Sequence, residues 1–167
     1  EIWVGTAEDC QGDGIPDECQ LTTALTYQRD DGLMKLALGW PHSHMAWLSG
    51  HEVQPGHELV TEVQVAWGVM PAGSPATVVL WTDPNGDGDP ADALPLLEVP
   101  LTSSEEFTGE LVTIDVPDTS VGPAGARFFV GVYGSFDQSW FPIGFDSSIA
   151  SLTSYLVASD TPIQPDD

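Results

Sequence analysis

The chain has 167 residues, with 26 acidic side chains against three basic ones and a formal net charge of −23. Its length fits one domain with its own core. A hydrophobic content of 41% with six tryptophans excludes a disordered acidic polymer. Three basic residues cannot form the patch that nucleic acid or an anionic membrane requires, so we expect neither partner. The sequence shows no membrane span and no signal peptide, so we expect no membrane insertion and a mature, processed chain.

The chain begins with a short apolar segment, EIWV, ahead of an acidic loop, and we expect residues 1–20 to form this segment and a small cap. The fold of a single monomer offers Ile2, Trp3 and Val4 no evident partner. An apolar β-prone segment of this kind can add to the sheet edge of a neighbouring subunit. We therefore expect a homo-oligomer or polymer in which these residues, or the Pro-containing tail at the other end of the chain, contact a second copy.

The first acidic loop, DCQGDGIPDEC, places oxygen-bearing side chains at alternate positions. In calcium loops, side chains at positions 1, 3 and 5 converge on the ion, a glycine at position 6 permits a sharp turn, and a backbone carbonyl follows at position 7. The spacing therefore predicts a Ca²⁺ site in this loop. Its ligands are predicted to be Asp9, Gln11, Asp13, the Ile15 carbonyl and Asp17.

Cys10 and Cys19 are the only cysteines, and they bracket this loop. If paired, they close a short ring and contribute roughly 2.5–3 kcal/mol by loop-closure arithmetic, less any strain. A disulfide implies an oxidising compartment, and calcium loops of this kind suit extracellular calcium levels. We predict a Cys10–Cys19 bond and an extracellular or cell-surface location.

The rest of the chain consists of short runs rich in β-branched and aromatic residues, separated by Gly, Pro and Asp turns. Fourteen prolines and 17 glycines, with no sustained 3.6-residue period, argue against long helices. We predict an all-β, antiparallel, jelly-roll-like β-sandwich over residues 21–160, followed by a tail over residues 161–167. The predicted strands are Leu21–Gln28, Met34–Leu38, His44–Leu48, Glu58–Trp67, Ala76–Thr82, Leu94–Val99, Phe107–Val116, Arg127–Tyr133 and Leu152–Ala158.

A second acidic loop, DPNGDGDPAD, lies between two of these strands and repeats the 1-3-5 spacing, with Gly88 at position 6. The same residue types also make ordinary turns, which is the alternative. Mg²⁺ fits less well, because it prefers a rigid octahedron. The pattern predicts a second Ca²⁺ site, and hence two or more ions. Its ligands are predicted to be Asp83, Asn85, Asp87, the Asp89 carbonyl and Asp92.

The first loop resembles the DxNxDGxPDxC loops of thrombospondin type 3 and dockerin-like calcium repeats, which are abundant in secreted planctomycete-type bacterial proteins. The segment VAWG…PATVVLWTDPNGDGDPADA…FFVGVYG…FPIGFD resembles an uncharacterised β-sandwich module found beside such loops. The resemblance implies calcium binding and no known activity. Gln11 stands where Asp or Asn is usual and Gln20 where a final acid often stands, and Glu18 can substitute as a ligand. The side-chain ligands that carry over are Asp9, Gln11, Asp13 and Asp17, with the carbonyl of Ile15.

Enzyme motifs are weak in this sequence. The segment HEVQPGH, residues 51–57, misses the zinc-protease pattern HExxH, because Pro55 stands where the second histidine is needed. There is no GxSxG elbow and no glycine-rich phosphate loop ahead of a helix. We therefore expect no enzyme.

Trp140 and Phe141 lie in the loop-like segment FDQSWFPIGFD and could form a platform on which a sugar stacks. The alternative is that they cover the edge of the core. The sequence as a whole predicts a secreted, calcium-stabilised structural or surface module, a subunit of an extracellular filament or surface assembly. The alternative function is a calcium-stabilised carbohydrate-binding module with a polysaccharide partner.

Overall fold

The computed structural model describes residues 25–28, 32–40, 44–103, 109–136, 140–146 and 154–163. Regular structure in these residues consists of ten β-strands and one short 3-10 helix. All strand pairs are antiparallel, so the all-β class predicted from the sequence is confirmed. The elements are β1 (Leu36–Leu38), β2 (His44–Glu52), β3 (Leu59–Val65), β4 (Trp67–Val69), β5 (Pro75–Asp83), η2 (Pro90–Asp92), β6 (Leu94–Thr102), β7 (Val112–Ser120), β8 (Arg127–Ser135), β9 (Phe141–Phe145) and β10 (Ser154–Ser159).

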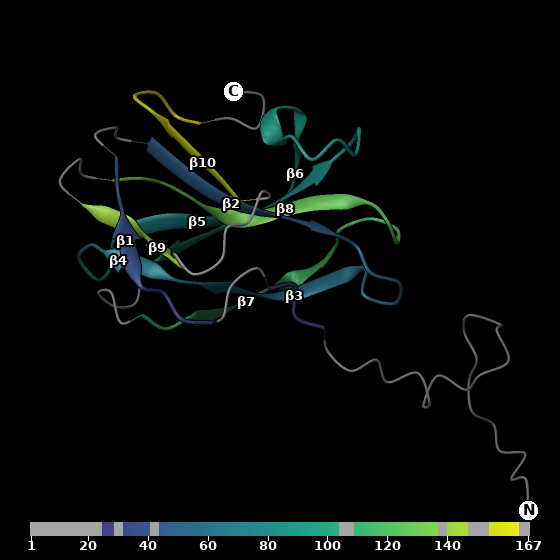
Figure 1. Cartoon of the computed structure of the whole chain (residues 1–167), viewed down its shortest axis with the longest axis horizontal. Helices are drawn as coiled ribbons and strands as arrows, with labels where there is room; N and C mark the ends of the chain where they lie inside the picture. The colour runs from purple at the N-terminus through teal and green to yellow at the C-terminus, as the bar shows by residue number, and fades with distance from the viewer. Residues whose placement is uncertain are drawn as a thin grey trace, which may run out of the picture.

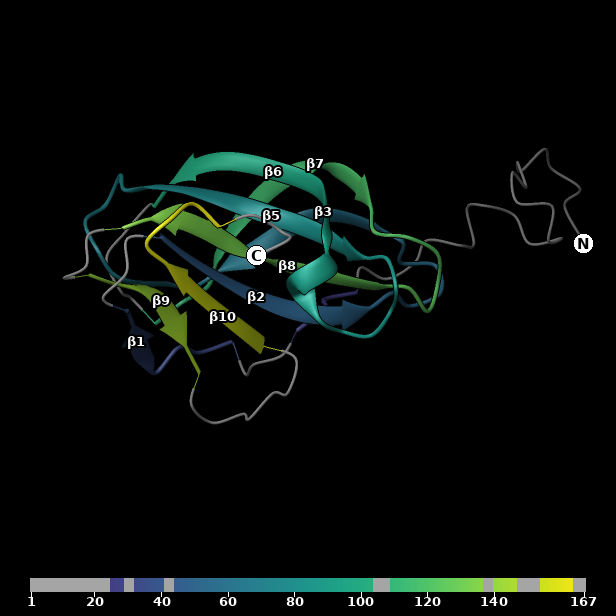
Figure 2. The ribbon, with the colours of Figure 1, turned by 90° about the horizontal axis from the view of Figure 1, so that it is seen from above.

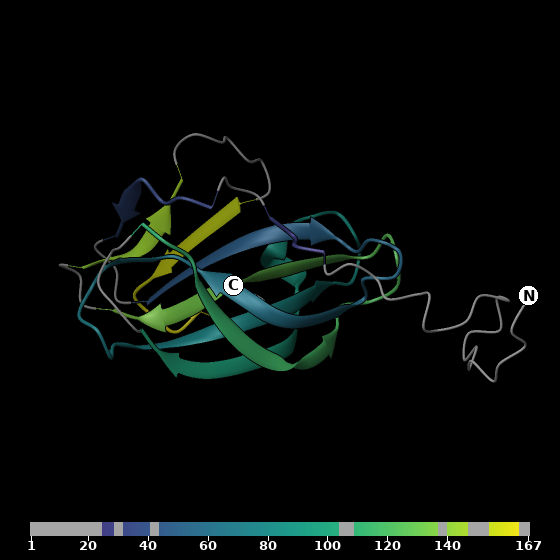
Figure 3. The same ribbon diagram turned by 90° about the horizontal axis from the view of Figure 1, so that it is seen from below.

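The strands form two layers that face each other (Figure 1). One layer is a five-stranded sheet in the order β10-β2-β8-β5-β6, and the other contains a three-stranded sheet, β1-β9-β4, and the pair β3-β7. The view from below shows β3 and β7 in front of the five-stranded sheet (Figure 3). Most consecutive strands, such as β4 and β5 or β6 and β7, lie in different layers, as in a jelly roll. The predicted sandwich is therefore confirmed.

The main hydrophobic core lies between the layers. Side chains alternate between the two faces of a strand, so the residues that reach this core come from alternate positions along the strands. Full burial of one large apolar side chain contributes roughly 1.5–3 kcal/mol. The core residues include Met45, Val78, Leu80, Phe128 and Val132 from the five-stranded sheet, and Val63, Val65, Trp67, Val116 and Ile143 from the opposite layer.

A second, smaller apolar cluster lies on the outer face of the five-stranded sheet. Val79 and Phe129 are sequence neighbours of core residues, so their side chains point away from the core. Ala93, which directly follows η2, is buried against this outer cluster, 1% exposed. The connection between β5 and β6 therefore folds back over the outer face instead of extending into solvent (Figure 2). The outer cluster consists of Leu48, Val79, Trp81, Ala93 and Phe129.

The single strand predicted over Glu58–Trp67 is divided in the structure. β3 pairs with β7, whereas β4 pairs with β9, and Ala66 lies between them. The amide of Gly144 donates a hydrogen bond of 3.1 Å to the carbonyl of Ala66, so pairing with β9 begins at this residue. The alternating pattern of the segment is continuous, but its two halves have different partner strands.

Two further expectations about strands were wrong. Residues 25–28 form no strand, although a strand was predicted over Leu21–Gln28. Residues Phe141–Phe145, within the segment expected to be a loop, form β9 at the centre of a sheet. Pro142 and Gly144 interrupt the apolar alternation and are typical of turns, which explains the error.

Candidate cation site

The second acidic loop forms the candidate site, at one end of the five-stranded sheet. Asp83 is the last residue of β5 and is buried, while Asp87 and Asp92 are exposed. One oxygen from each of these three carboxylates lies within 4.8 Å of the other two. An equilateral triangle with 4.8 Å sides has its centre about 2.8 Å from each corner, close to the roughly 2.3–2.6 Å of Ca²⁺–oxygen bonds. A small contraction of the loop would therefore bring all three oxygens to bonding distance from a common centre.

Backbone amides hold the first carboxylate of the loop in place. The Asp83 carboxylate accepts one hydrogen bond of 2.7 Å from the amide of Gly86 and another of 2.7 Å from the amide of Gly88. Both glycines have positive φ angles, +75° and +83°, which other residues rarely adopt. The loop can wrap around this carboxylate because glycine stands at both positions.

The side chain of Asn85 lies among the other carboxylates. Its Nδ2 donates hydrogen bonds of 3.0 Å to Asp87 Oδ2 and 2.6 Å to Asp92 Oδ2. Its Oδ1 accepts a hydrogen bond of 2.8 Å from the amide of Asp87. The partial positive charge of this amide group therefore lies between two negative groups, where it reduces their repulsion.

The side chain of Asp89 caps the short helix η2 and does not join the cluster of carboxylates. Its side chain accepts a hydrogen bond of 3.0 Å from the amide of Ala91 and caps η2. Its own amide donates to Asp87 Oδ1 at 2.7 Å. The short turn that starts at Pro90 brings Asp92 back toward the first half of the loop. The side chain of Asp89 is thus used in capping, whereas the atom predicted to bind a cation is its carbonyl oxygen.

One of the three basic residues of the chain lies beside this loop. Arg127 is paired across the sheet with Asp83 on one side and with Glu52 on the other. A Cβ atom built at Gly88 would lie 2.5 Å from Arg127 Nη1, so the guanidinium is against the loop backbone. Lys35, a second basic residue, forms an ion pair of 2.9 Å with Asp146 elsewhere in the fold. The acidic loop thus has one cationic neighbour on β8.

The structure brings together the side chains of Asp83, Asn85, Asp87 and Asp92, as the spacing predicted. The first acidic loop cannot be compared in the same way, because it lies outside the described residues. The spacing also predicted Gly88 at position 6 of the loop, but no pattern in the sequence indicated Tyr155, whose hydroxyl donates to the Gly88 carbonyl from β10. The predictions outside the described residues concern the ligands Asp9, Gln11, Asp13, Ile15, Asp17 and Glu18, the pair Cys10 and Cys19, and the assembly residues Ile2, Trp3 and Val4.

The predicted sugar platform is divided between a half-buried and an exposed residue. Trp140 packs against the main core, whereas Phe141 is 50% exposed. Phe141 is paired with Val69 on β4, which is also 50% exposed, and Trp40, just beyond β1, is 52% exposed. A Cβ built at Gly39 would lie 2.9 Å from the Cα of Phe141, so the end of β1 is close to β9. Trp40, Phe141 and Val69 therefore lie at neighbouring positions, and we call them the apolar edge.

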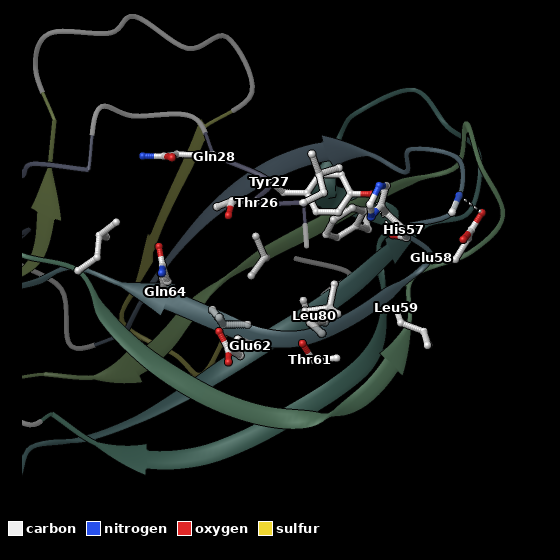
Figure 4. A pocket seen from close by; sticks show the side chains of 17 residues that line it. Thr26, Tyr27, Gln28, His57, Glu58, Leu59, Thr61, Glu62, Gln64 and Leu80 are labelled. Carbon is white, nitrogen blue, oxygen red and sulfur yellow. Dashed lines mark hydrogen bonds between the residues drawn. The ribbon is translucent and has the colours of Figure 1, made fainter. Parts of the chain in front are cut away.

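A groove of about 500 Å³ lies between residues 25–28 and β3 (Figure 4). Leu80 and Phe128, which are core residues, are part of its lining. The hydroxyl of Tyr27 donates to the His57 carbonyl at 3.0 Å and accepts from the Gln54 amide at 2.9 Å. These bonds attach residues 25–28 to the turn after β2, so this hydroxyl has a structural role.

The segment HEVQPGH forms the end of β2 and the following turn, so it does not form the helix of a zinc protease. His51 is buried against the rings of Tyr27 and Phe128, at centroid distances of 5.6 Å and 5.5 Å. Its surroundings are aromatic.

Comparison of the chain with protein-family models, curated proteins and solved structures found no match. Within the described part of the chain, no helix is long and apolar enough to cross a membrane.

Proposed function

We propose that the protein is a calcium-stabilised structural module and that the loop between β5 and β6 binds Ca²⁺. The observation that carries this proposal is the convergence of carboxylates from Asp83, Asp87 and Asp92 within 4.8 Å. Three negative groups at this separation repel one another. A divalent cation bound between them would convert this repulsion into attraction.

The donor set favours Ca²⁺ over other cations. All the predicted ligands are oxygen atoms, which suit hard cations, whereas zinc sites use sulfur and nitrogen. The ligands come from alternate residues of one loop and offer several oxygens, which suits Ca²⁺ better than the rigid octahedron of Mg²⁺. On binding, rotation of the Asn85 amide by about 180° would direct Oδ1 to the side where Nδ2 now faces Asp87 and Asp92. Asn85 would then be a ligand at position 3 of the loop.

A cation in this loop would stabilise more than the loop. The same connection carries Ala93 onto the outer cluster, so order in the loop favours burial of Trp81 and Phe129. Because the unfolded chain has no assembled site, the free energy of Ca²⁺ binding adds to the free energy of folding. The proposed role of the ion is therefore structural.

The wider proposal is that this module is secreted and acts in an extracellular filament or surface assembly. The charge of −23 makes copies of the chain repel one another, so association should depend on cations that screen or bridge them. This proposal includes three features predicted from the sequence: the first calcium loop, the Cys10–Cys19 bond and the apolar segment at Ile2, Trp3 and Val4.

Calcium titration of chelator-treated protein tests the site. Calorimetry should find one bound ion fewer in Asp87→Asn than in the wild type. Asp118→Asn removes the same charge from an exposed position on β7 and should leave the number of ions unchanged. Equal numbers of ions in the wild type and in Asp87→Asn would refute a site in this loop, and a wild type that binds no Ca²⁺ would refute the calcium function.

Light scattering tests assembly. The mass of the intact protein should rise with Ca²⁺, and deletion of residues 1–6 should abolish that rise. An intact protein that stays monomeric at high concentration in Ca²⁺ would contradict assembly and would make glycan binding the leading candidate.

Carbohydrate binding is the second candidate, and the apolar edge favours it. Aromatic rings such as those of Phe141 and Trp40 are large, rigid contact surfaces when they are exposed. Retention on insoluble polysaccharide should be lost in Phe141→Ala and reduced in Trp140→Ala. Leu59→Ala, which truncates a side chain that is 59% exposed on β3, is the control and should be retained. Equal retention of all three variants, or no retention of the wild type, would refute this candidate.

A further inference from the structure

The acidic loop contacts the last strand of the fold as well as its own hairpin. The hydroxyl of Tyr155, on β10, donates a hydrogen bond to the carbonyl of Gly88 in the loop. The ring of Tyr155 packs edge-on against Phe129, at a centroid distance of 5.6 Å and an interplanar angle of 86°. In the sheet order, β10 and β6 are at opposite edges, so the connection from β5 to β6 spans the outer face to reach β10 (Figure 2).

Gly88 links the candidate cation ligands to this contact. Its amide donates to Asp83 Oδ2 at 2.7 Å, and its carbonyl accepts from Tyr155. Its φ angle of +83° excludes most other residues, and Arg127 occupies the space where a side chain would begin. Any movement of the Asp83 carboxylate relative to the loop therefore displaces the same residue that Tyr155 contacts.

β10 has few other attachments. It pairs with β2 from Ser154 to Ser159 and has no other strand partner within the described residues. Each of its residues is at least partly exposed, and Leu156 is 41% exposed. A strand held by one ladder and little side-chain burial opens more easily than a core strand. Beyond the ladder with β2, β10 is attached by Ala158, which packs against the main core, and by Tyr155, which packs against the outer cluster and donates to Gly88.

We propose that Tyr155 is a positioning residue for the cation site, and that Ca²⁺ binding and docking of β10 are coupled through Gly88. The proposal depends on the calcium function proposed above. When Ca²⁺ is removed, repulsion among the carboxylates opens the loop and displaces the Gly88 carbonyl from Tyr155. When Ca²⁺ binds, the loop contracts and the carbonyl is held where the hydroxyl reaches it. Such coupling is reciprocal: if bound Ca²⁺ strengthens the contact between Tyr155 and Gly88 by some factor, that contact strengthens Ca²⁺ binding by the same factor. Removal of the hydroxyl must therefore weaken Ca²⁺ binding and reduce the effect of Ca²⁺ on β10.

The test compares the wild type with Tyr155→Phe, which removes only the hydroxyl. Hydrogen exchange followed by mass spectrometry should show that Ca²⁺ slows exchange over residues 154–159 in the wild type, and that this slowing is mostly lost in the variant. A net hydrogen bond of ordinary strength corresponds to a loss of about 2- to 12-fold in calcium affinity, measured by titration. Tyr133→Phe, on the same outer face but stacked on His44, is the matched control and should behave as the wild type.

The outcomes separate this proposal from the calcium function. If the wild type binds Ca²⁺ in this loop, but Tyr155→Phe binds it equally tightly and exchange over residues 154–159 does not respond to Ca²⁺, the coupling is refuted and the calcium function stands. If Asp87→Asn shows that no ion binds in this loop, both are refuted. Weaker binding in Tyr155→Phe together with loss of the calcium effect on β10, and no change in Tyr133→Phe, supports the coupling.

Discussion

Asn85→Asp is the substitution that most directly separates a cation site from an ordinary turn. The amide of Asn85 donates to the carboxylates of Asp87 and Asp92 at 3.0 Å and 2.6 Å. The substitution preserves the shape of the side chain but replaces this donor with another carboxylate. In the absence of Ca²⁺ it should destabilise the protein, whereas in the presence of Ca²⁺ it adds a charged ligand at position 3 of the loop. The effect on stability should therefore depend strongly on the cation.

The magnitude follows from the geometry. The existing carboxylate oxygens lie within 4.8 Å of one another, and at this distance two unit charges in water repel by about 0.9 kcal/mol. The new carboxylate faces at least two others, so the free energy of unfolding should fall by about 2 kcal/mol in chelator. For a chain of this size, that corresponds to a Tm about 4–8 °C lower.

Calcium should act in the opposite direction. With a Kd of about 10⁻⁴–10⁻³ M, as in extracellular modules, roughly 10 mM Ca²⁺ stabilises the wild type by about 1.4–2.7 kcal/mol. This raises its Tm by about 3–11 °C. In Asn85→Asp a tenfold gain in affinity adds about 1.4 kcal/mol. Calcium should therefore restore most of the stability that the variant loses in chelator.

Calorimetric melts in EDTA, CaCl₂, MgCl₂ and NaCl at matched ionic strength provide the assay. Gln54→Glu makes the same change of charge in an exposed turn and should respond to Ca²⁺ as the wild type does. If Asn85→Asp lowers Tm equally in EDTA and in Ca²⁺, no cation binds beside this residue. A wild-type Tm that is the same in EDTA and in Ca²⁺ would refute a structural role for the ion.

Two further substitutions test the sandwich itself. Glu62 is directly opposite Asp115 in the β3–β7 pair, so Glu62→Lys replaces a repulsion with an attraction and should stabilise the protein by about 0.2–1 kcal/mol in thermal melts. The gain should be smaller at high salt. If Glu98→Lys on β6 gives an equal gain, the effect comes from net charge alone and not from the pairing with Asp115. A Cβ at Gly68 would lie 1.9 Å from the backbone oxygen of Phe141, so Gly68→Ala should destabilise by about 3 kcal/mol in denaturant titrations, and a loss below about 0.5 kcal/mol would contradict this packing.

Much of the candidate site could be predicted, because its chemistry is local. The ligand residues from Asp83 to Asp92 span ten positions, and their convergence depends on turn residues within the same segment, chiefly Gly86 and Gly88 with their positive φ angles. The capping of η2 by Asp89 is also a contact between near neighbours. Short-range interactions of this kind follow from residue type and spacing.

The parts of the fold that escaped prediction depend on partner strands. β9 contains a proline and a glycine, and it is a strand because β1 and β4 pair with it on either side. The division of Glu58–Trp67 at Ala66 has no local signal, since it reflects a change of partner from β7 to β9. Strand propensity describes only how well a residue fits a sheet, and the neighbouring strands decide whether the sheet exists there.

The sequence by itself determined the all-β class and the second acidic loop, because alternation, turn residues and ligand spacing act over a few residues. Tertiary structure alone decided that this loop folds onto the outer face, buries Ala93 and contacts Tyr155, which is 67 residues from Gly88. It also decided that Trp140 packs against the core while Phe141 is exposed. The physical reason is that these contacts depend on which strands are neighbours in the sheet, a property of the folded chain as a whole and not of any local segment.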